Sequence, residues 1–411
     1  MPEFLSLVSP EAALSLLFKH LDPVLRDEDT ATEQALGKVT AENIISSQDL
    51  PEFRRSTVDG YAIMARDSHG ASESLPAYLK LAGEVLMGNE PGFDLDDKEC
   101  ALIHTGGMLP KVANAVLMLE DTQVLDNGEI EIYRSVASGE NLIEIGEDVP
   151  EGGTVIPKGT RLRPAEIGGL LALGITKIKT VIPPKFGIIS SGDEVIQPDQ
   201  KPKPGEVRDI NSYTLGALIS ELGAEAIHYG IIPDNRENLR EIIQIGLQEC
   251  DHLIVTAGSS ASSRDLTADV MNELGDPGVL VHGVSIKPGK PTIFALAGEK
   301  VMIGLPGNPV SALVIAYILV KPIIQAYLGL ENRKFSASIP AKLTMNVPSQ
   351  AGREDWIPVR LIEGKKEVFQ AEPIFGRSNL IFLLAKADGL VKIPSPTTGL
   401  EAGAAVSVRL F

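Results

Sequence analysis

Residues 300–312, KVMIGLPGNPVSA, join a short apolar run to a Gly/Pro turn and the start of a long apolar segment. The run at 300–304 is typical of a buried strand, and residues 310–328 are typical of a helix. Asn308 suits the N-cap position and Pro309 the first helical position. A capped helix start after a strand offers unpaired N–H groups to an anion. A well-capped helix without a ligand explains the same residues.

A cationic turn lies just upstream of this stretch. Residues 285–291, SIKPGKP, carry Lys287 and Lys290 ahead of a second short apolar run at 292–296. Lysine binds anions as a point charge, and two lysines on a stiff loop beside a helix start suit a phosphate. The turn therefore favours an anion site.

Strand–turn–helix units repeat before that turn. Apolar runs at 186–190, 226–232 and 252–256 each precede polar residues and a helical pattern, the first helix capped by Asn211 and the third spanning about 264–274. This alternation predicts a doubly wound, mostly parallel sheet, whose ligands sit beyond the carboxyl ends of the strands. We place the active site there because five residues follow the expected strand ends: Glu194, Asp234, Ser259, Asp265 and Pro306.

The charge of the chain excludes several kinds of partner. The 411 residues contain 37 Lys and Arg but 55 Asp and Glu, for a formal net charge of −18. An acidic surface repels nucleic acid and anionic membranes, so an anionic substrate needs a local cationic pocket. We expect no nucleic-acid partner and no membrane partner, and small-molecule substrates instead.

Cysteine, histidine and hydropathy patterns add no further site. Cys100 and Cys250 lie far apart without a CxxC pattern, which indicates buried thiols rather than a disulfide or zinc site, and the six histidines have no metal-ligand spacing. The N-terminus lacks a targeting signal, and the most apolar stretch, 310–328, is interrupted by Lys321 and Pro322. We expect a cytoplasmic protein.

Five motifs in a fixed order resemble those of the molybdopterin molybdenumtransferase family, which includes MoeA and the E domain of gephyrin. They are STVDGYA at 56–62, SSGDE at 190–194, GIIPD at 230–234, KPGKP at 287–291 and GLPGNPVSA at 304–312. The resemblance covers essentially the whole chain. It implies an enzyme of molybdenum cofactor biosynthesis that inserts molybdate into adenylylated molybdopterin, with Mg²⁺-dependent release of AMP.

The resemblance also implies a division of the chain into four domains. Residues 1–50 and 146–182 would form an elongated α+β domain used for homodimerisation, with 51–145 inserted as a mostly β domain. Residues 183–330 would form a MogA-like α/β molybdopterin-binding domain. Residues 331–411, whose short β-type runs independently indicate a small barrel, would form a β-barrel-like terminal domain. Other cofactor-biosynthesis proteins are further candidate partners.

Site residues carry over from the family by position. The catalytic set would be Asp59, Thr105, Asp148, Glu194, Asp234 and Asp265. Mg²⁺ would be held by Asp59, Glu194, Asp234 and Asp265, with Asp59 acting across the dimer. Molybdopterin-AMP and molybdate, the substrates, would be bound by Gly258, Ser259, Arg264, Lys287, Lys290, Pro306, Pro309, Ser311, Arg353 and Ser378. A turn, a loop or a surface charge is the alternative explanation for Asp59, Asp148, Arg353 and Ser378.

One stretch departs from the family pattern. Residues 257–265, AGSSASSRD, are one residue shorter than usual, with serines in place of valines and Arg264 beside Asp265. Serine and arginine donors still suit an anion. Two alternatives therefore stay open: a relative that inserts tungstate, and a non-enzymatic molybdopterin carrier or scaffold.

Overall fold

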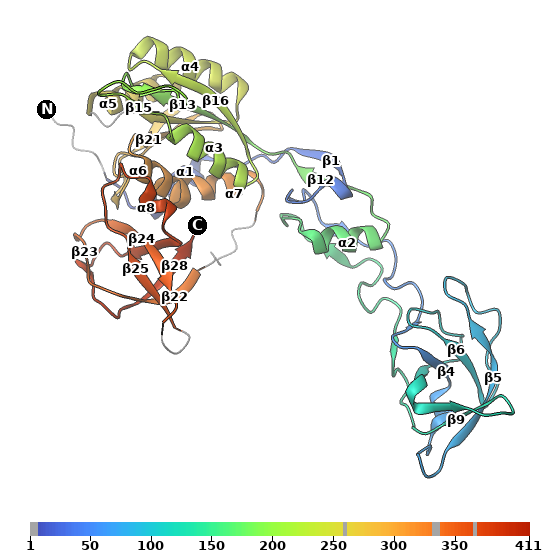
Figure 1. Cartoon of the computed structure of the whole chain (residues 1–411). Helices are drawn as coiled ribbons and strands as arrows, with labels where there is room; N and C mark the ends of the chain where they lie inside the picture. Colours follow the sequence, from blue (N-terminus) through green and yellow to red (C-terminus); the bar gives the residue numbers. More distant parts are fainter. Residues whose placement is uncertain (1–6, 258–260, 331–337, 365–367) are drawn as a thin grey trace.

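The computed structural model describes residues 7–257, 261–330, 338–364 and 368–411. Figure 1 shows an elongated molecule in which an α/β domain and a C-terminal barrel lie together at one end. A narrow segment containing β1 (Asp27–Ala31), β12 (Lys177–Val181) and α2 (Pro164–Ala172) leads from them to a separate β domain. The predicted multidomain α/β architecture is confirmed.

The α/β domain is built on one mixed sheet. Its strands, in spatial order, are β16 (Glu225–Ile232), β13 (Lys185–Ser191), β17 (His252–Ala257), β21 (Lys300–Pro306), β20 (Ile293–Ala297) and β18 (Pro277–His282). The first four strands pair in parallel, whereas β20 and β18 pair antiparallel at one edge. The predicted mostly parallel sheet is therefore correct, with an antiparallel extension formed by the two strands on either side of the 285–291 turn.

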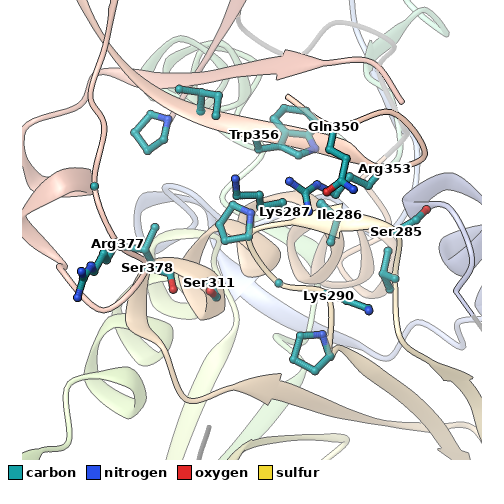
Figure 2. A pocket seen from close by; sticks show the side chains of 18 of the residues that line it. Ser285, Ile286, Lys287, Lys290, Ser311, Gln350, Arg353, Trp356, Arg377 and Ser378 are labelled. Atoms are coloured by element: carbon teal, nitrogen blue, oxygen red, sulfur yellow. The ribbon is translucent and has the colours of Figure 1, made fainter. Parts of the chain in front are cut away.

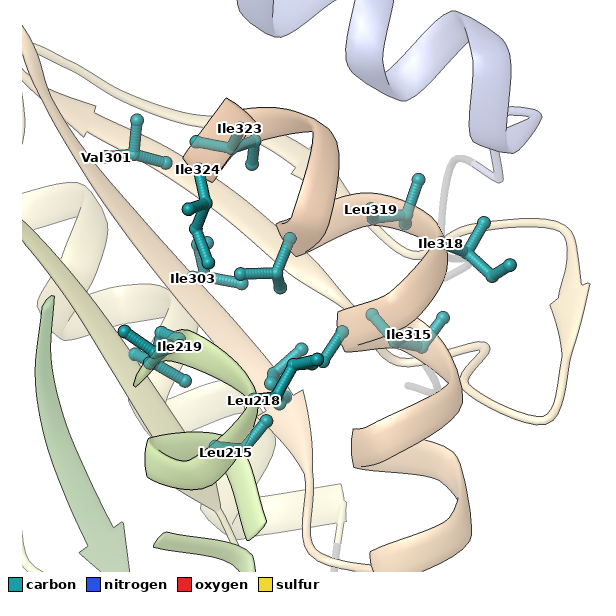
Figure 3. Packing of buried hydrophobic residues seen from close by; sticks show 14 of the residues in the cluster. Leu215, Leu218, Ile219, Val301, Ile303, Ile315, Ile318, Leu319, Ile323 and Ile324 are labelled. Carbon is teal, nitrogen blue, oxygen red and sulfur yellow. The ribbon is translucent and has the colours of Figure 1, made fainter. Parts of the chain in front are cut away.

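Helices cover both faces of this sheet. They are α3 (Asn211–Glu221), α4 (Arg236–Glu249), α5 (Ala261–Leu274), α6 (Pro309–Ile315) and α7 (Lys321–Tyr327), with a π-helical turn (Ala316–Val320) between the last two. On one face, Leu215 and Ile219 of α3 pack near Ile303 of β21 (Figure 3). On the other, Leu239 of α4 and Met271 of α5 form a second buried cluster. The stiff sheet fixes the loops at its ends.

The most apolar helix is largely buried. Among the described residues, Pro309–Tyr327 is long and apolar enough to cross a membrane, and 61% of its most apolar window is buried inside the protein. Ile315, Leu319 and Ile324 belong to the main core cluster (Figure 3). The apolar surface of this segment is thus used for packing within the chain.

The N-terminal helix belongs to the α/β core. Ser9 followed by Pro10 predicts a capped helix start, and the observed helix α1 (Pro10–His20) is capped by Ser9, whose Oγ accepts a 3.1 Å hydrogen bond from Ala12 N–H. Ala13 and Leu17 are fully buried in the cluster that contains Ile303. Our boundaries placed residues 1–50 in the elongated domain, but α1 packs on the α/β domain because its apolar stripe is buried there.

The sequence pattern at about residues 30–36, followed by Gly37, predicts a second short helix, but this helix is not formed. That segment instead continues β1 and then makes one 3₁₀ turn (Thr32–Gln34). β1 pairs antiparallel with β12, and Thr30 Oγ1 lies 2.7 Å from Thr180 Oγ1 across the pair. Pairing with a distant strand therefore outweighs the local helical pattern. Nearby, β2 (Ile44–Ile45) pairs with β11 (Thr154–Ile156), so the chain passes through this segment twice.

The β domain is inserted between those two passages. Its sheet has the order β7 (Ala115–Met118), β4 (Gly60–Ile63), β6 (Glu99–Ile103), β5 (Ala77–Val85), β9 (Glu129–Ile132) and β8 (Thr122–Val124). At its base, β3 (Arg55–Ser56) pairs with β10 (Leu142–Ile143). Apolar clusters lie on both faces of the sheet, one around Ile63 and one around Ile103.

The C-terminal domain closes into a barrel. Its strands are β22 (Ser338–Leu343), β24 (Glu354–Ile362), β25 (Phe369–Pro373), β26 (Gly389–Ile393) and β28 (Ala405–Leu410), and a β24–β26 pairing completes the ring. Smaller elements are β23 (Val347–Pro348), β27 (Gly399–Leu400) and α8 (Phe382–Ala385). The short strand β19 (Ile286–Lys287), from the cationic turn, pairs in parallel with β24. The turn is thus part of the junction between the two domains.

Candidate functional site

A large cavity lies at the junction of the α/β domain and the barrel. Its volume is about 810 Å³, and it is lined by the 285–291 turn, the start of α6 and two barrel segments, 348–358 and 374–378. Lys287, Lys290, Arg353 and Arg377 line it, and no acidic residue is among its described lining residues. We call it the cationic cavity. In a chain with a net charge of −18, such a wall attracts anions locally.

Two of these cations share one buried carboxylate. Arg353 Nε donates a 2.8 Å hydrogen bond to Asp355 Oδ1, and Lys287 Nζ lies 3.9 Å from Asp355 Oδ2. The Asp355 side chain is fully buried, whereas those of Lys287 and Arg353 are 58% and 32% exposed. Figure 2 shows Lys287 and Arg353 near the middle of the view with Trp356 close by. The carboxylate therefore anchors two cations whose outer atoms still face the cavity.

Hydroxyl groups line the opposite part of the cationic cavity. Ser311 of α6 and Ser378 of the barrel lie next to each other in Figure 2, and Arg377 extends away from them. The backbone N–H of Val310 donates to the Ser378 carbonyl over 3.0 Å, which joins the helix start to the barrel. Asn308 occupies the predicted N-cap position of α6, but its side chain makes no capping hydrogen bond. The helix start is therefore held by the neighbouring domain.

A second, smaller cavity lies at the carboxyl ends of the parallel strands. It measures about 360 Å³, and its lining includes Ser190, Ser191, Glu194, Asp209, Asn211, Thr256 and Pro309. We call it the strand-edge pocket. Its position agrees with the rule that ligands of open α/β sheets bind outside the carboxyl ends of the strands. Pro306, also predicted as a site residue, is the buried last residue of β21.

Asp209 gives the strand-edge pocket a fixed negative floor. The carboxylate is 5% exposed and accepts hydrogen bonds from the hydroxyls of Ser190 and Ser212, at 2.7 and 2.6 Å. It also accepts from the Ser212 N–H at 3.1 Å. Asn211 was predicted as the helix cap, but it is the first residue of α3, and the Asp209 carboxylate accepts from the first turn instead.

Predicted carboxylates gather on two neighbouring loops beside this pocket. The hydroxyl of Ser191 donates to Asp234, and the N–H of Asp234 donates to Asp193 Oδ1 over 3.1 Å. Glu194 follows on the first loop and is exposed. Asp265, on α5, is exposed as well. The structure thus links the loops of Glu194 and Asp234.

These carboxylates suit a Mg²⁺ ion that also binds substrate. Within the described part of one chain, no group of three His, Cys, Asp or Glu side chains could hold a metal ion alone. Mg²⁺, however, usually takes only one or two protein carboxylates and completes its octahedron with water and phosphate oxygens. Glu194 and Asp234 fit that requirement. The assignment of Asp59, Glu194, Asp234 and Asp265 to the metal stays a prediction.

Asp59 lies in the β domain, just before β4. Its Oδ1 accepts hydrogen bonds from the backbone N–H and the hydroxyl of Thr105, at 2.8 and 3.2 Å. These bonds, the backbone one first, hold the pKa of Asp59 below its ordinary value. His104 lies between two carboxylates, with Nδ1 3.7 Å from Asp59 and Nε2 3.2 Å from Glu84. The structure therefore brings Asp59 and Thr105 together and keeps the carboxylate ionised.

The Asp59–Thr105 pair is far from the cationic cavity of the same chain. The β domain and the α/β domain lie at opposite ends of the molecule (Figure 1). Asp148 is exposed on a loop where the elongated segment meets the β domain. Its backbone N–H donates a 3.0 Å hydrogen bond to the Leu50 carbonyl. These three residues can join Glu194 only if another copy of the chain supplies one half of the site.

Some predicted ligands fall outside the description. Gly258 and Ser259 lie outside the described residues, as does the side chain of Arg264. Conversely, the structure adds residues that the sequence had not indicated: Gln350, Trp356 and Arg377 in the cationic cavity, and Asp209 and Asn211 in the strand-edge pocket. Trp356 is the only tryptophan of the chain and lies three residues after Arg353, which could have drawn attention to it.

Comparison with known proteins places these cavities in a family context. Three family models match: the MoeA N-terminal region (domain I and II) at residues 8–174, a probable molybdopterin binding domain at 187–326 and the MoeA C-terminal region (domain IV) at 340–411. The molybdopterin molybdenumtransferase of Haemophilus influenzae is 30% identical over 402 residues, which cover 98% of each chain.

Solved structures agree along the whole chain. One crystal structure of a molybdopterin biosynthesis MoeA protein from Pyrococcus horikoshii is 38% identical with a TM-score of 0.81, and covers 98% of this chain and 99% of that one. Another from the same species is 31% identical with a TM-score of 0.86, and covers 99% and 100%.

Proposed function

The chain belongs to the MoeA family of molybdopterin molybdenumtransferases, enzymes of molybdenum cofactor biosynthesis, and we propose from this premise that it inserts molybdate into adenylylated molybdopterin with Mg²⁺-dependent release of AMP. The observation that carries the proposal is the cationic cavity, lined by four basic side chains and no described acidic one. It adjoins a pocket at the carboxyl ends of the strands. Together the two cavities can hold a substrate that has an anionic end in the cationic cavity and a less anionic end in the strand-edge pocket.

The cationic cavity performs the electrostatic part of the reaction. Molybdate and the adenylate phosphate are both anions, so bringing them together costs free energy unless fixed cations offset their repulsion. Lys287 and Arg353 are anchored by Asp355, and Ser311 and Ser378 add hydroxyl donors. Preorganised donors of this kind stabilise developing charge without reorganising during the reaction. These groups would hold the two anions side by side and stabilise the negative charge on AMP as it leaves.

The strand-end carboxylates account for the proposed metal requirement. Glu194 and Asp234 would hold Mg²⁺ together with oxygen atoms of the substrate. The ion would supply positive charge to the phosphate that carries AMP. Ser191 orients Asp234 through its hydroxyl, so this carboxylate is fixed before substrate binds.

The proposed enzyme acts as a homodimer with shared sites. Asp59, Thr105 and Asp148 lie too far along the molecule to reach the cationic cavity of their own chain (Figure 1). A second copy, placed so that its β domain faces this cavity, would supply them in trans, and Asp59 would arrive already ionised. We further propose a cytoplasmic location, with other cofactor-biosynthesis proteins as candidate partners.

AMP release from purified adenylylated molybdopterin tests the proposal. Release should require Mg²⁺ and rise on addition of molybdate. A parallel series with tungstate distinguishes the tungstate-inserting alternative, since the better anion identifies the metal. Tight binding without release under all conditions would contradict the proposal and support the carrier or scaffold alternative.

A further inference from the structure

A buried hydrogen-bond acceptor in the strand-edge pocket has no partner. Asn211 is 7% exposed, and its Nδ2 donates a 2.8 Å hydrogen bond to the Gly307 carbonyl. Its Oδ1 is buried and makes no hydrogen bond to any described residue. Buried polar atoms in native proteins are almost always paired, so an unpaired one that lines a cavity marks a place where a ligand donor fits.

The surroundings of Asn211 favour a neutral donor over a phosphate. The pocket floor contains the buried Ser190 and Thr256 and the Asp209 carboxylate. Glu194 lines the same pocket, and Arg208 is its one basic residue among the described lining. Apart from a phosphate bridged by the proposed Mg²⁺, an anion would therefore be repelled by the carboxylates of this pocket and attracted to the neighbouring cationic cavity. A ring that carries N–H groups would instead meet acceptors.

The two cavities share a wall. Pro309 lines the strand-edge pocket, whereas Val310 and Ser311 line the cationic cavity. On the barrel side, Ser378 lines the cationic cavity and its neighbour Asn379 the strand-edge pocket. The hydrogen bond from Val310 N–H to the Ser378 carbonyl joins the two halves of the wall. A ligand with two chemically different ends can thus place one end on each side of α6.

Resting on the function proposed above, we propose that the strand-edge pocket binds the pterin end of the substrate and that Asn211 Oδ1 accepts an N–H of the 2-amino group on its aminopyrimidinone edge. The phosphate and the oxyanion then occupy the cationic cavity. The dithiolene, which lies between the two ends of the substrate, is held at the shared wall formed by α6. Asn211 in this arrangement is a specificity-determining residue, since it selects a ring that carries a 2-amino group.

A comparison of two free ring compounds tests the proposal on the unaltered chain. Pterin carries a 2-amino group, whereas lumazine has an oxygen in its place and lacks that donor. A site built to bond an N–H rejects an analogue without it. Titration followed by the fluorescence of each compound should give about tenfold tighter binding of pterin than of lumazine. Equal affinities would overturn the proposal.

AMP distinguishes the two ends of the substrate. It should bind without displacing pterin, because it belongs in the cationic cavity. Displacement of pterin by AMP at matching affinity would assign the strand-edge pocket to the nucleotide and overturn the proposal.

Two substitutions of Asn211 separate ligand binding from the hydrogen bond to Gly307. Asn211→Leu loses both the acceptor and the amide donor, whereas Asn211→Asp keeps an acceptor and loses the donor. We expect Asn211→Leu to weaken pterin binding about tenfold and Asn211→Asp to bind more tightly than Asn211→Leu. Equal weakening of both, or no weakening of Asn211→Leu, would mean a purely structural role. Asn89→Leu, an exposed asparagine of the β domain, is the matched control.

The outcomes separate this inference from the proposed function. If a variant fails to fold, which thermal denaturation reveals, the pterin–lumazine comparison decides alone. AMP release without discrimination between the two rings would remove the inference and leave the function. Discrimination without AMP release would remove the function and leave a pterin-binding pocket.

Discussion

Arg353, which directly precedes β24 of the barrel, and Asp355, the second residue of that strand, form the charged contact on which the cationic cavity is built. The Nε of Arg353 donates a 2.8 Å hydrogen bond to a carboxylate with no exposed surface. Lys287 reaches the same carboxylate from the α/β domain at 3.9 Å, through β19, which pairs with β24. The basic wall of the cavity is therefore assembled from two domains around one buried carboxylate.

The buried carboxylate predicts an order of stabilities. Arg353→Ala leaves Asp355 buried with only a distant cation, which should lower the free energy of unfolding by about 2 kcal/mol. Lys287→Ala removes a longer contact from a mostly exposed side chain and should cost at most about 1 kcal/mol. Urea unfolding followed by the fluorescence of Trp356, the single tryptophan, gives both midpoints. A larger loss for Lys287→Ala would contradict this geometry.

Lys290 predicts a salt-sensitive contribution to oxyanion binding. Its side chain is exposed in the cationic cavity, so Lys290→Ala should weaken molybdate binding about tenfold at low ionic strength and less at high salt, where charges are screened. Titration with molybdate can be followed by Trp356, which lines the same cavity. Lys386→Ala, an exposed lysine of the barrel outside the cavity lining, should change nothing. A loss independent of salt would argue against a simple charge effect.

Shared sites predict complementation between two inactive variants. Asp59→Ala disables the β domain, and Glu194→Ala disables the strand ends, so their heterodimer keeps one intact site of two. Co-expression should restore about a quarter of the wild-type rate of AMP release, since half of the dimers are heterodimers. Asp59→Ala paired with Thr105→Val is the control, because both changes lie in the β domain and no intact site forms. Equal rates from the two pairs would refute shared sites.

His252 predicts a loss of stability in mild acid. Its Nδ1 accepts from Val301 N–H at 3.2 Å, and burial lowers its pKa to about 3 from an ordinary value of 6.5. The unfolded chain therefore takes up a proton between these values while the folded chain does not, so stability falls as pH drops from 6.5 towards 3. His252→Asn keeps an acceptor for Val301 and removes the titration. Its melting temperature should fall less between pH 7 and pH 5 than that of wild type, and identical slopes would exclude His252 as the cause.

Local sequence patterns predicted the α/β domain because each of its strands and helices carries its own apolar pattern within a short stretch of sequence. The apolar runs at 186–190 and 252–256 lie within β13 and β17, and the helix predicted at about 264–274 lies within α5 (Ala261–Leu274). The strand ends then placed Glu194 and Asp234 near one another, as the linked loops show. In a parallel sheet the carboxyl ends of all strands lie at the same edge, so residues that follow the strands are expected to lie close together. This part of the site could therefore be predicted from the sequence.

The other parts of the fold and of the candidate site depend on contacts between segments that are distant in the sequence, so local patterns did not predict them. β1 replaced an expected helix because it pairs with β12, about 150 residues later. The addition of β19 to the barrel, which brings Lys287 to Asp355, has no local signal. In the proposed dimer, the positions of Asp59 and Thr105 relative to the cavity depend on a second chain, and one sequence does not give them. The sequence suggested that Asn211 caps α3. In the structure Asp209 accepts from the first turn of that helix instead, and Asn211 Oδ1 is left without a hydrogen-bond donor among the described residues.

The most direct test of the central claim measures two products in one reaction. The purified chain is incubated with adenylylated molybdopterin, Mg²⁺ and molybdate, and both released AMP and pterin-bound molybdenum are quantified over time. Insertion coupled to release predicts that the two rise together in a one-to-one ratio and that omission of Mg²⁺ abolishes both. AMP that accumulates without pterin-bound molybdenum, or a bound substrate that yields neither product, would contradict the account.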